Sequence, residues 1–235
     1  MQLALTYLQH INHNMSIFDR LLSVIAPYEC LGCRTEGSLL CDSCNHQLPV
    51  IPPRCYRCRK VSPQALTCRP CRSSSRLYSV RVATIYTGLA KDVVWNLKFH
   101  GAQAVTKQMA KRMFRNIDPD VSYVIVPVPT ASSRIRRRGY DQAVLLAREL
   151  AKLSGQPLVN CLKRTNQSHQ VGARRSQRLA QLKGAFRVVR VGSIHNANIL
   201  LIDDVVTTGS TLESAATLLR RSGARRVEAL VFAQP

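Results

Sequence analysis

Acidic side chains are scarce in this sequence, and long apolar runs are missing altogether. The 235 residues include 13 Asp and Glu against 34 Lys and Arg, a formal net charge of +21 at pH 7. This basic excess predicts attraction to polyanions such as nucleic acid, phosphorylated metabolites or an anionic membrane surface. No run of 18 or more apolar residues occurs, so we expect no membrane-spanning helix.

Aromatic residues are also few, at 6% of the chain, whereas hydrophobic residues make up 46%. A chain of this composition can bury a core and is not disordered as a whole. Residues 1–14 lack both the basic n-region and the small-residue cleavage site of a secretory signal, so we expect a cytoplasmic protein. Met15 opens a short amphipathic segment that Pro27 stops, and the sequence is compatible with a native start at Met1 or at Met15.

Cysteine, by contrast, is abundant, and eight of the nine cysteines form four Cys-x-x-Cys pairs. Such a turn presents two thiolates on one side of a tight loop, and two turns complete the tetrahedral shell of a structural zinc ion. We predict two zinc sites, paired either sequentially, as in a double zinc ribbon, or cross-braced. A disulfide framework fits less well, because no secretory signal precedes the cysteines. The predicted ligands are Cys30, Cys33, Cys41, Cys44, Cys55, Cys58, Cys68 and Cys71.

Two neighbouring residues are not expected to be ligands. His46 follows the second motif, but eight cysteines already suffice for two tetrahedral sites. Cys161 stands alone in an apolar stretch, which is typical of a core residue.

After the cysteine motifs, strand-like runs alternate with helix-like runs. This alternation is typical of an α/β fold, a parallel sheet with helices on both faces. We predict an N-terminal helical segment over 1–29, a double zinc-ribbon module over 30–75 and an α/β domain over 76–235. The expected strands are 80–87, 121–128, 185–189, 198–202 and 227–232, and the expected helices are 89–99, 102–115, 141–153 and 210–221.

The segment ILLIDDVVTTGST, residues 199–211, carries the chemistry. Four apolar residues form a buried strand, and Asp203 and Asp204 stand at its carboxyl end, where open α/β sheets bind ligands. The turn that follows offers backbone N–H groups, hydroxyls and a helix N-terminus, which together suit a phosphate. Paired acids beside a phosphate loop suit a sugar phosphate, because carboxylates accept hydrogen bonds from vicinal hydroxyls.

This segment resembles the 5-phosphoribosyl-1-pyrophosphate (PRPP) motif of type I phosphoribosyltransferases. The stretches VPVPTASSRIRRRGYDQA (126–143), LKFHG (97–101) and LKGAF (182–186), placed after a cysteine-rich N-terminus, resemble the ComF or GntX family. The resemblance covers roughly residues 16–234. It implies a type I phosphoribosyltransferase-like domain behind a zinc-binding module and a role in natural competence and the use of external DNA.

The resemblance also implies roles for individual residues. Asp203 and Asp204, the expected catalytic pair, would bind the ribose hydroxyls of PRPP, and Mg²⁺ would bridge the pyrophosphate and ribose oxygens. The 5-phosphate would lie in the loop formed by Thr207, Thr208, Gly209, Ser210 and Thr211. The pyrophosphate loop would be Pro127, Val128, Pro129 and Thr130. Further contacts, to pyrophosphate or to nucleic acid, would come from Arg134, Arg136, Arg137, Arg138, Lys98, Gln170 and Arg178.

The segment 164–182 is similar to the mobile loop that closes over such a site. Gln181 departs from the family pattern there, as Asn often precedes the Lys-Gly-Ala-Phe-like stretch. This difference weakens any role assigned to that position.

Residues 131–190 hold 14 Lys and Arg against two acids. One PRPP molecule does not require so many cations, whereas a groove that follows a nucleic-acid backbone does. The favoured hypothesis is therefore a DNA-handling factor that binds PRPP and contacts single-stranded DNA. One alternative is a phosphoribosyltransferase acting on an unidentified base or nucleotide-like acceptor. The other is an adaptor for DNA-processing proteins, with a vestigial PRPP site and with arginines and an exposed Tyr56 on its ribbons.

Overall fold

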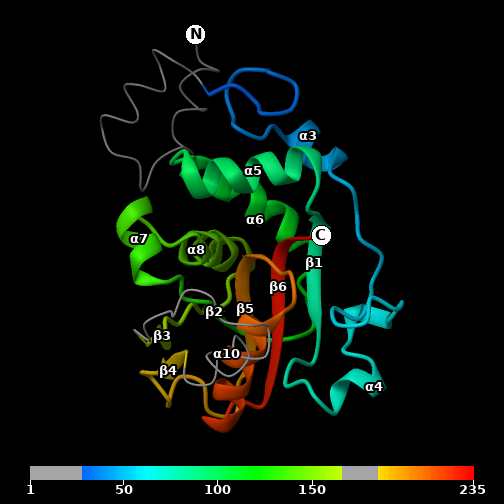
Figure 1. Cartoon of the computed structure of the whole chain (residues 1–235), viewed down its shortest axis with the longest axis vertical. Coiled ribbons are helices and arrows are strands. Elements are labelled where there is room, and N and C mark those ends of the chain that lie inside the picture. The colour runs from blue at the N-terminus through cyan, green and yellow to red at the C-terminus, as the bar shows by residue number, and fades with distance from the viewer. Residues whose placement is uncertain (1–27, 166–184) are drawn as a thin grey trace, which may run out of the picture.

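The computed structural model describes residues 28–165 and 185–235 (Figure 1). Its centre is a four-stranded sheet in the order β1-β6-β5-β2, and every neighbouring pair is parallel. The parallel sheet expected from the sequence is thus confirmed. The strands are β1 (Val80–Ile85), β2 (Val124–Pro127), β5 (Asn198–Val205) and β6 (Arg226–Gln234).

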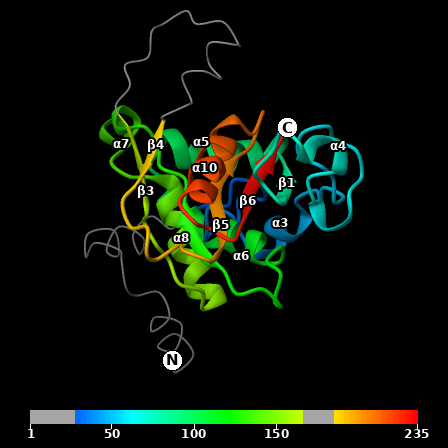
Figure 2. The ribbon, with the colours of Figure 1, turned by 90° about the horizontal axis from the view of Figure 1, so that it is seen from below.

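Helices cover both faces of this sheet (Figure 2). Successive side chains of a strand point to opposite faces, so Leu200 and Ile202 pack in one core cluster, and Ile199 and Leu201 in the other. The first cluster includes residues of α5 (Gly88–Phe99), α6 (Thr106–Phe114) and α8 (Gln142–Ser154), and the second includes residues of α10 (Ser210–Arg221).

The strands of the parallel sheet differ in their bounds from the prediction, and two of these differences bear on the candidate site. β2 begins only at Val124 because its partner β5 begins at Asn198, and the register pairs Val124 with Ile199. β5 continues beyond the predicted end at Ile202 and includes both Asp203 and Asp204, since Asp203 still pairs with Val231 of β6. The acid pair is therefore fixed by strand hydrogen bonds, not by a loop.

The predicted strand at 185–189 exists but does not belong to the parallel sheet. It is β4 (Phe186–Val188), and it pairs antiparallel with β3 (Leu162–Arg164) in a separate two-stranded sheet. β3 was not predicted, because three residues with two cations carry no clear period. Phe186 of β4 packs into the core cluster on the α10 side.

Two helices are each followed by a glycine, and one helix of the α/β domain was not predicted from the sequence. Gly155 adopts a left-handed conformation after α8, and Gly139 does the same after α7 (Ser132–Arg138). The sequence did not predict α7, which contains four arginines and one isoleucine. The predicted helix 102–115 divides into a short 3-10 turn, η2 (Gln103–Val105), and α6.

The cysteine-rich segment forms two small knuckles with the short elements α3 (Asp42–Gln47), η1 (Pro63–Ala65) and α4 (Arg69–Arg72). The first knuckle shares a core with the α/β domain: Cys30 and Leu40 are buried in the same cluster as Val93 and Leu97 of α5. The domain boundary between residues 75 and 76 stays a prediction. The assignment of residues 1–29 to a separate helical segment also stays a prediction. Among the described residues, no helix is long and apolar enough to cross a membrane.

Candidate functional site

The carboxyl ends of β2 and β5 bring the two predicted loops together. The register pairs Pro127 with Ile202, and the backbone N–H of Val128 donates to the carbonyl of Ile202 at 3.0 Å. The segment from Pro127 to Thr130 therefore starts beside Asp203. Two loops from neighbouring parallel strands form one edge, as expected for a ligand site in an open α/β sheet.

Asp204 is buried and has a cation beside it. Its Oδ2 lies 2.7 Å from Nζ of Lys98, a residue of the last turn of α5. The Lys98 side chain is 24% exposed and that of Asp204 is 5% exposed. The sequence named both residues as site candidates but did not pair them, because 106 positions of chain separate them.

Asp203 lies on the opposite side of the same strand from Asp204, and its Oδ1 accepts the backbone N–H of Asp204 at 2.9 Å. Burial, followed by the neighbouring Asp204 carboxylate, raises the pKa of Asp203 well above its usual range. The Lys98 ammonium opposes that shift and Asp141 adds to it. A half-buried carboxyl group of this kind is stabilised in its charged form when a cation or hydroxyl donors arrive beside it.

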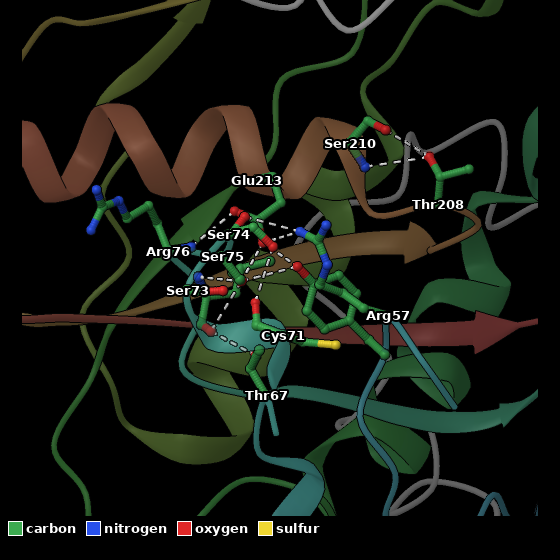
Figure 3. A network of polar contacts seen from close by, with 12 residues as sticks. Arg57, Thr67, Cys71, Ser73, Ser74, Ser75, Arg76, Thr208, Ser210 and Glu213 are labelled. Carbon is green, nitrogen blue, oxygen red and sulfur yellow. Dashed lines mark hydrogen bonds and ion pairs between the residues drawn. The ribbon is translucent and has the colours of Figure 1, made fainter. Parts of the chain in front are cut away.

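The predicted phosphate loop closes onto the N-terminus of α10. Gly209 has φ +76°, a left-handed conformation that suits glycine, and helix α10 begins at the next residue. The Thr208 and Ser210 hydroxyls lie 2.8 Å apart, and Thr208 Oγ1 accepts the backbone N–H of Ser210 at 3.4 Å (Figure 3). Thr207 and Thr208 are exposed, so hydroxyls and helix N–H groups face an incoming anion.

Tyr56, in the second knuckle, packs against this loop. A Cβ on Gly209 would lie 2.5 Å from Cε2 of Tyr56. Tyr56 is only 2% exposed, so the expected exposed tyrosine for partner docking is wrong. Burial, then its hydrogen bond to Glu213, raises the pKa of Tyr56, so the phenol stays protonated and donates its proton to the Glu213 carboxylate.

Glu213, in the first turn of α10, joins the knuckle to the phosphate loop (Figure 3). Its Oε2 accepts the backbone N–H of Arg76 at 3.0 Å, and the Ser75 hydroxyl donates to its Oε1. Arg57 lies 3.7 Å from the same carboxylate. The sequence missed this cluster, because Glu213 looks like an ordinary acid in a first helical turn.

The segment expected to hold pyrophosphate is fixed by Asp141. Its Oδ2 accepts the backbone N–H of Thr130 at 2.9 Å, and its Oδ1 accepts the Thr130 hydroxyl at 3.0 Å. Asp141 also caps α8 through the backbone N–H of Ala143. An Asp at the start of the predicted helix 141–153 is a common N-cap residue. Nothing in the sequence indicated its contact with Thr130.

The predicted arginines fall into two groups. Arg134, Arg136 and Arg137 of α7 are exposed. Arg138 instead donates from Nε to the carbonyl of Lys98 at 2.7 Å and from Nη1 to the Gln142 side chain, so it fastens α7 to the end of α5.

Arg164, which the sequence did not single out, lies near the acid pair. Burial lowers the pKa of Arg164, the Arg134 cation lowers it further, and Asp203 opposes both effects. Gln170, Arg178 and most of the predicted closing loop lie outside the described residues.

The cysteines form two groups of four in sequential order, so the cross-braced alternative is excluded. Within each group all sulfurs lie within 4.8 Å of one another. The Sγ atoms of Cys33 and Cys41 are 3.7 Å apart, and those of Cys58 and Cys68 are 3.5 Å apart. Sulfurs bound at about 2.3 Å to a tetrahedral zinc lie about 3.8 Å apart, so both groups can hold a metal. Neither group includes His46, and Cys161 is buried as expected.

Comparisons with known proteins agree with this geometry. A model of the phosphoribosyl transferase domain family matches residues 100–235. The competence protein ComFC of Bacillus subtilis is 31% identical over 195 residues, which cover 78% of this chain and 79% of that protein. Competence protein F of Haemophilus influenzae is 28% identical, with coverage of 86% and 94%. The DNA utilization protein YhgH of Salmonella typhimurium is 32% identical, with coverage of 80% and 81%.

Proposed function

The chain belongs to the phosphoribosyl transferase domain family and, within it, to the ComF family, and on that basis we propose that it binds PRPP and acts in the uptake or use of external DNA. The observation that carries the PRPP proposal is the meeting of Asp203 and Asp204 with the loop 207–211 at one edge of the sheet. Two adjacent carboxylates beside a phosphate-binding helix N-terminus suit the hydroxyls and the phosphate of a ribose phosphate.

Each part of PRPP has a counterpart at this edge. The 5-phosphate would accept hydrogen bonds from the backbone N–H groups and hydroxyls of 207–211, and the helix dipole of α10 would stabilise its charge. The ribose hydroxyls would donate to Asp203 and Asp204. The pyrophosphate would lie along Pro127–Thr130, the segment that Asp141 orders, with exposed Arg134 nearby.

Metal ions complete the proposal. Zinc in each four-cysteine group would stabilise a segment too short to build a core of its own. Mg²⁺ would enter with PRPP, Asp203 and Asp204 would be the residues that face it, and it would offset the negative charge of the pyrophosphate. The charge on Asp204 is already offset by Lys98, so Asp203 is the acid left to respond to an arriving cation.

A transferase reaction is the second candidate, and the cations around the pyrophosphate segment favour it. In such a reaction the bond from ribose C1 to the pyrophosphate oxygen breaks, an atom of the acceptor bonds to C1, and the proton that this atom carried passes to solvent. Negative charge then grows on pyrophosphate, where Arg134 and Arg164 would stabilise it. Release of pyrophosphate in the presence of a candidate base measures this activity, and binding of PRPP with no release would leave a sensor role.

The DNA partner follows from the relatives' names and from the charge of the chain. A competence or DNA-utilization role brings the protein into contact with imported strands, and a formal charge of +21 favours a polyanion. We place this protein in the cytoplasm, where single strands arrive and where thiolates stay reduced for zinc.

Calorimetric titration tests the PRPP proposal. The zinc-loaded chain with Mg²⁺ should bind PRPP at least tenfold more tightly than ribose 5-phosphate or pyrophosphate alone, because only PRPP fills both loops. Equal affinity for pyrophosphate and PRPP would show that the basic surface, and not the sugar-phosphate site, holds the ligand.

A further inference from the structure

A hollow lies at the edge of the sheet where the strands begin, opposite the edge that carries the candidate PRPP site. Its volume is about 640 Å³. The residues around it belong to α4, precede β1 and β2, lie at the start of β5 and β6, or end α10, so it lies away from the carboxyl edge. Figure 1 shows α4 beside the start of β1. Asn198 at this end of β5 stands five residues before Asp203, roughly 16 Å along a strand.

Arginines dominate this hollow, which we call the arginine cleft. Among the described residues that line it, the only acid is Asp120. They come from the second knuckle, the strand starts and the end of α10, so distant parts of the chain converge. The arginines are Arg72, Arg76, Arg220, Arg225 and Arg226.

In the part of the chain that the structure describes, four of these five cations have no acidic partner. Arg226 binds Glu228 at 2.6 Å, and Glu228 also binds Arg81 at 2.8 Å. Within the described ranges, no carboxylate lies at ion-pair distance from the other four arginines. Gathering like charges in one hollow is unfavourable unless an anion enters it.

Neutral groups hold several of these side chains in position. The guanidinium groups of Arg226 and Arg72 lie 4.5 and 5.3 Å from the centre of the Tyr78 ring. Arg220 donates to the carbonyl oxygen of Ala224 at 2.6 Å and to that of Arg225. Nε of Arg226 is buried and has no hydrogen-bond partner in the described structure. Ring and carbonyl contacts order the cations without neutralising them.

We propose that the arginine cleft binds consecutive phosphates of a single strand of nucleic acid. The inference rests on the DNA role proposed above and gives it a place on the molecule. Four unneutralised cations exceed the need of one phosphate and match a short run of phosphodiesters. A concave hollow of this size admits one flexible strand, whereas a rigid duplex lies outside it. Because the PRPP site is at the opposite edge, both ligands bind together.

The test compares two triple variants of the zinc-loaded chain. Arg72→Gln/Arg76→Gln/Arg225→Gln removes three of the exposed cations of the cleft, and Arg134→Gln/Arg136→Gln/Arg137→Gln removes the same charge from α7. Fluorescence anisotropy follows a labelled 12-nucleotide oligothymidylate over a range of salt concentrations. We expect the cleft variant to bind at least tenfold more weakly, with a log–log salt slope smaller by about 2 for three lost phosphate contacts. The α7 variant should stay within threefold of the native chain.

Several outcomes would overturn the inference, and they differ from failure of the function proposed above. Unchanged binding by the cleft variant, with loss in the α7 variant, would place the strand at the PRPP edge. Displacement of the oligonucleotide by equimolar inorganic pyrophosphate would make the cleft a small-anion site. Competition between Mg²⁺–PRPP and the oligonucleotide would also contradict separate sites. If the native chain binds PRPP but no oligonucleotide, the DNA contact itself is wrong, whereas the PRPP proposal stands.

Discussion

Tyr56 packs directly against Gly209, so a residue between two metal-binding cysteines supports the loop expected to hold a phosphate. The space beside Gly209 is filled by the tyrosine ring, with only 2.5 Å left for a Cβ. Glu213 binds the Tyr56 hydroxyl one helical turn later. The second knuckle is therefore part of the candidate site, and not merely a neighbouring module.

Adding a methyl group at Gly209 should damage the site. Gly209→Ala meets both the Tyr56 ring and an unfavourable φ of +76°, so it should lower the free energy of unfolding by about 1–3 kcal/mol. PRPP affinity should fall with it. Gly192→Ala is the matched control, since nothing lies within 4 Å of its Cβ. Thermal unfolding and PRPP titration measure both effects, and equal behaviour of the two variants would contradict the packing described.

The two knuckles should differ in their effect on PRPP. Cys58→Ser and Cys33→Ser each remove one exposed ligand from a four-cysteine group. Tyr56, which packs against the phosphate loop, lies between two cysteines of the second group only. Cys58→Ser should therefore weaken PRPP binding by about tenfold, or 1.4 kcal/mol. Cys33→Ser should lose zinc while nearly keeping PRPP affinity. Zinc content and calorimetry test this prediction, which fails if both variants lose affinity equally.

Removal of the Lys98 ammonium should destabilise the fold, because it leaves the Asp204 carboxylate buried without a cation beside it. Both side chains are mostly buried, so Lys98→Met should lower stability by about 1–2 kcal/mol after allowance for solvent screening. Lys152→Met breaks a pair whose lysine is 59% exposed and should cost no more than about 0.5 kcal/mol.

A double-mutant cycle with Asp204→Asn isolates the interaction of Lys98 with Asp204. A coupling energy near zero would show that the 2.7 Å contact contributes nothing to stability.

Asp203 should make stability depend on pH in a defined direction. Its pKa is raised in the folded chain, so the folded state keeps this proton to a higher pH than the unfolded state does. The contribution of Asp203 to the free energy of unfolding is therefore at its full value below the pKa that Asp203 has in the unfolded chain, near 4. It is lost as the pH rises through the higher pKa of Asp203 in the folded chain. Asp203→Asn should unfold at a higher temperature than the native chain above that range and show no gain below it. Parallel profiles for the two proteins would contradict the raised pKa.

Much of the fold and the acid–phosphate motif could be predicted from local sequence. The apolar run before Asp203 specified a buried strand, and the predicted helix 141–153 agrees with α8 to within one residue at each end. Strand lengths were less predictable, because β2 begins where its partner β5 begins and β5 continues as far as it pairs with β6, and no local residue encodes this. The short β3 strand and α7 helix carry too few apolar residues to show a period.

The sequence predicted the residues expected to bind ligands and metals, but not the residues that hold them in position. Spacing alone predicted both four-cysteine groups, although it left the pairing open. The contacts from Lys98 to Asp204, from Asp141 to Thr130 and from Tyr56 to Gly209 depend on tertiary packing. Tyr56 shows the difficulty most clearly, since a tyrosine among arginines in a cysteine turn has every local feature of an exposed residue.

Thermal unfolding of the zinc-loaded chain with and without Mg²⁺–PRPP tests the central claim most directly. At about 100 times its dissociation constant, PRPP should add about 2.7 kcal/mol of stability, a rise of roughly 5–10 °C for a chain of this size. Asp203→Asn/Asp204→Asn should abolish that rise while remaining folded. A native chain that is folded, zinc-loaded and unaffected by PRPP, or a double variant that responds as fully as the native chain, would contradict a PRPP site at Asp203 and Asp204.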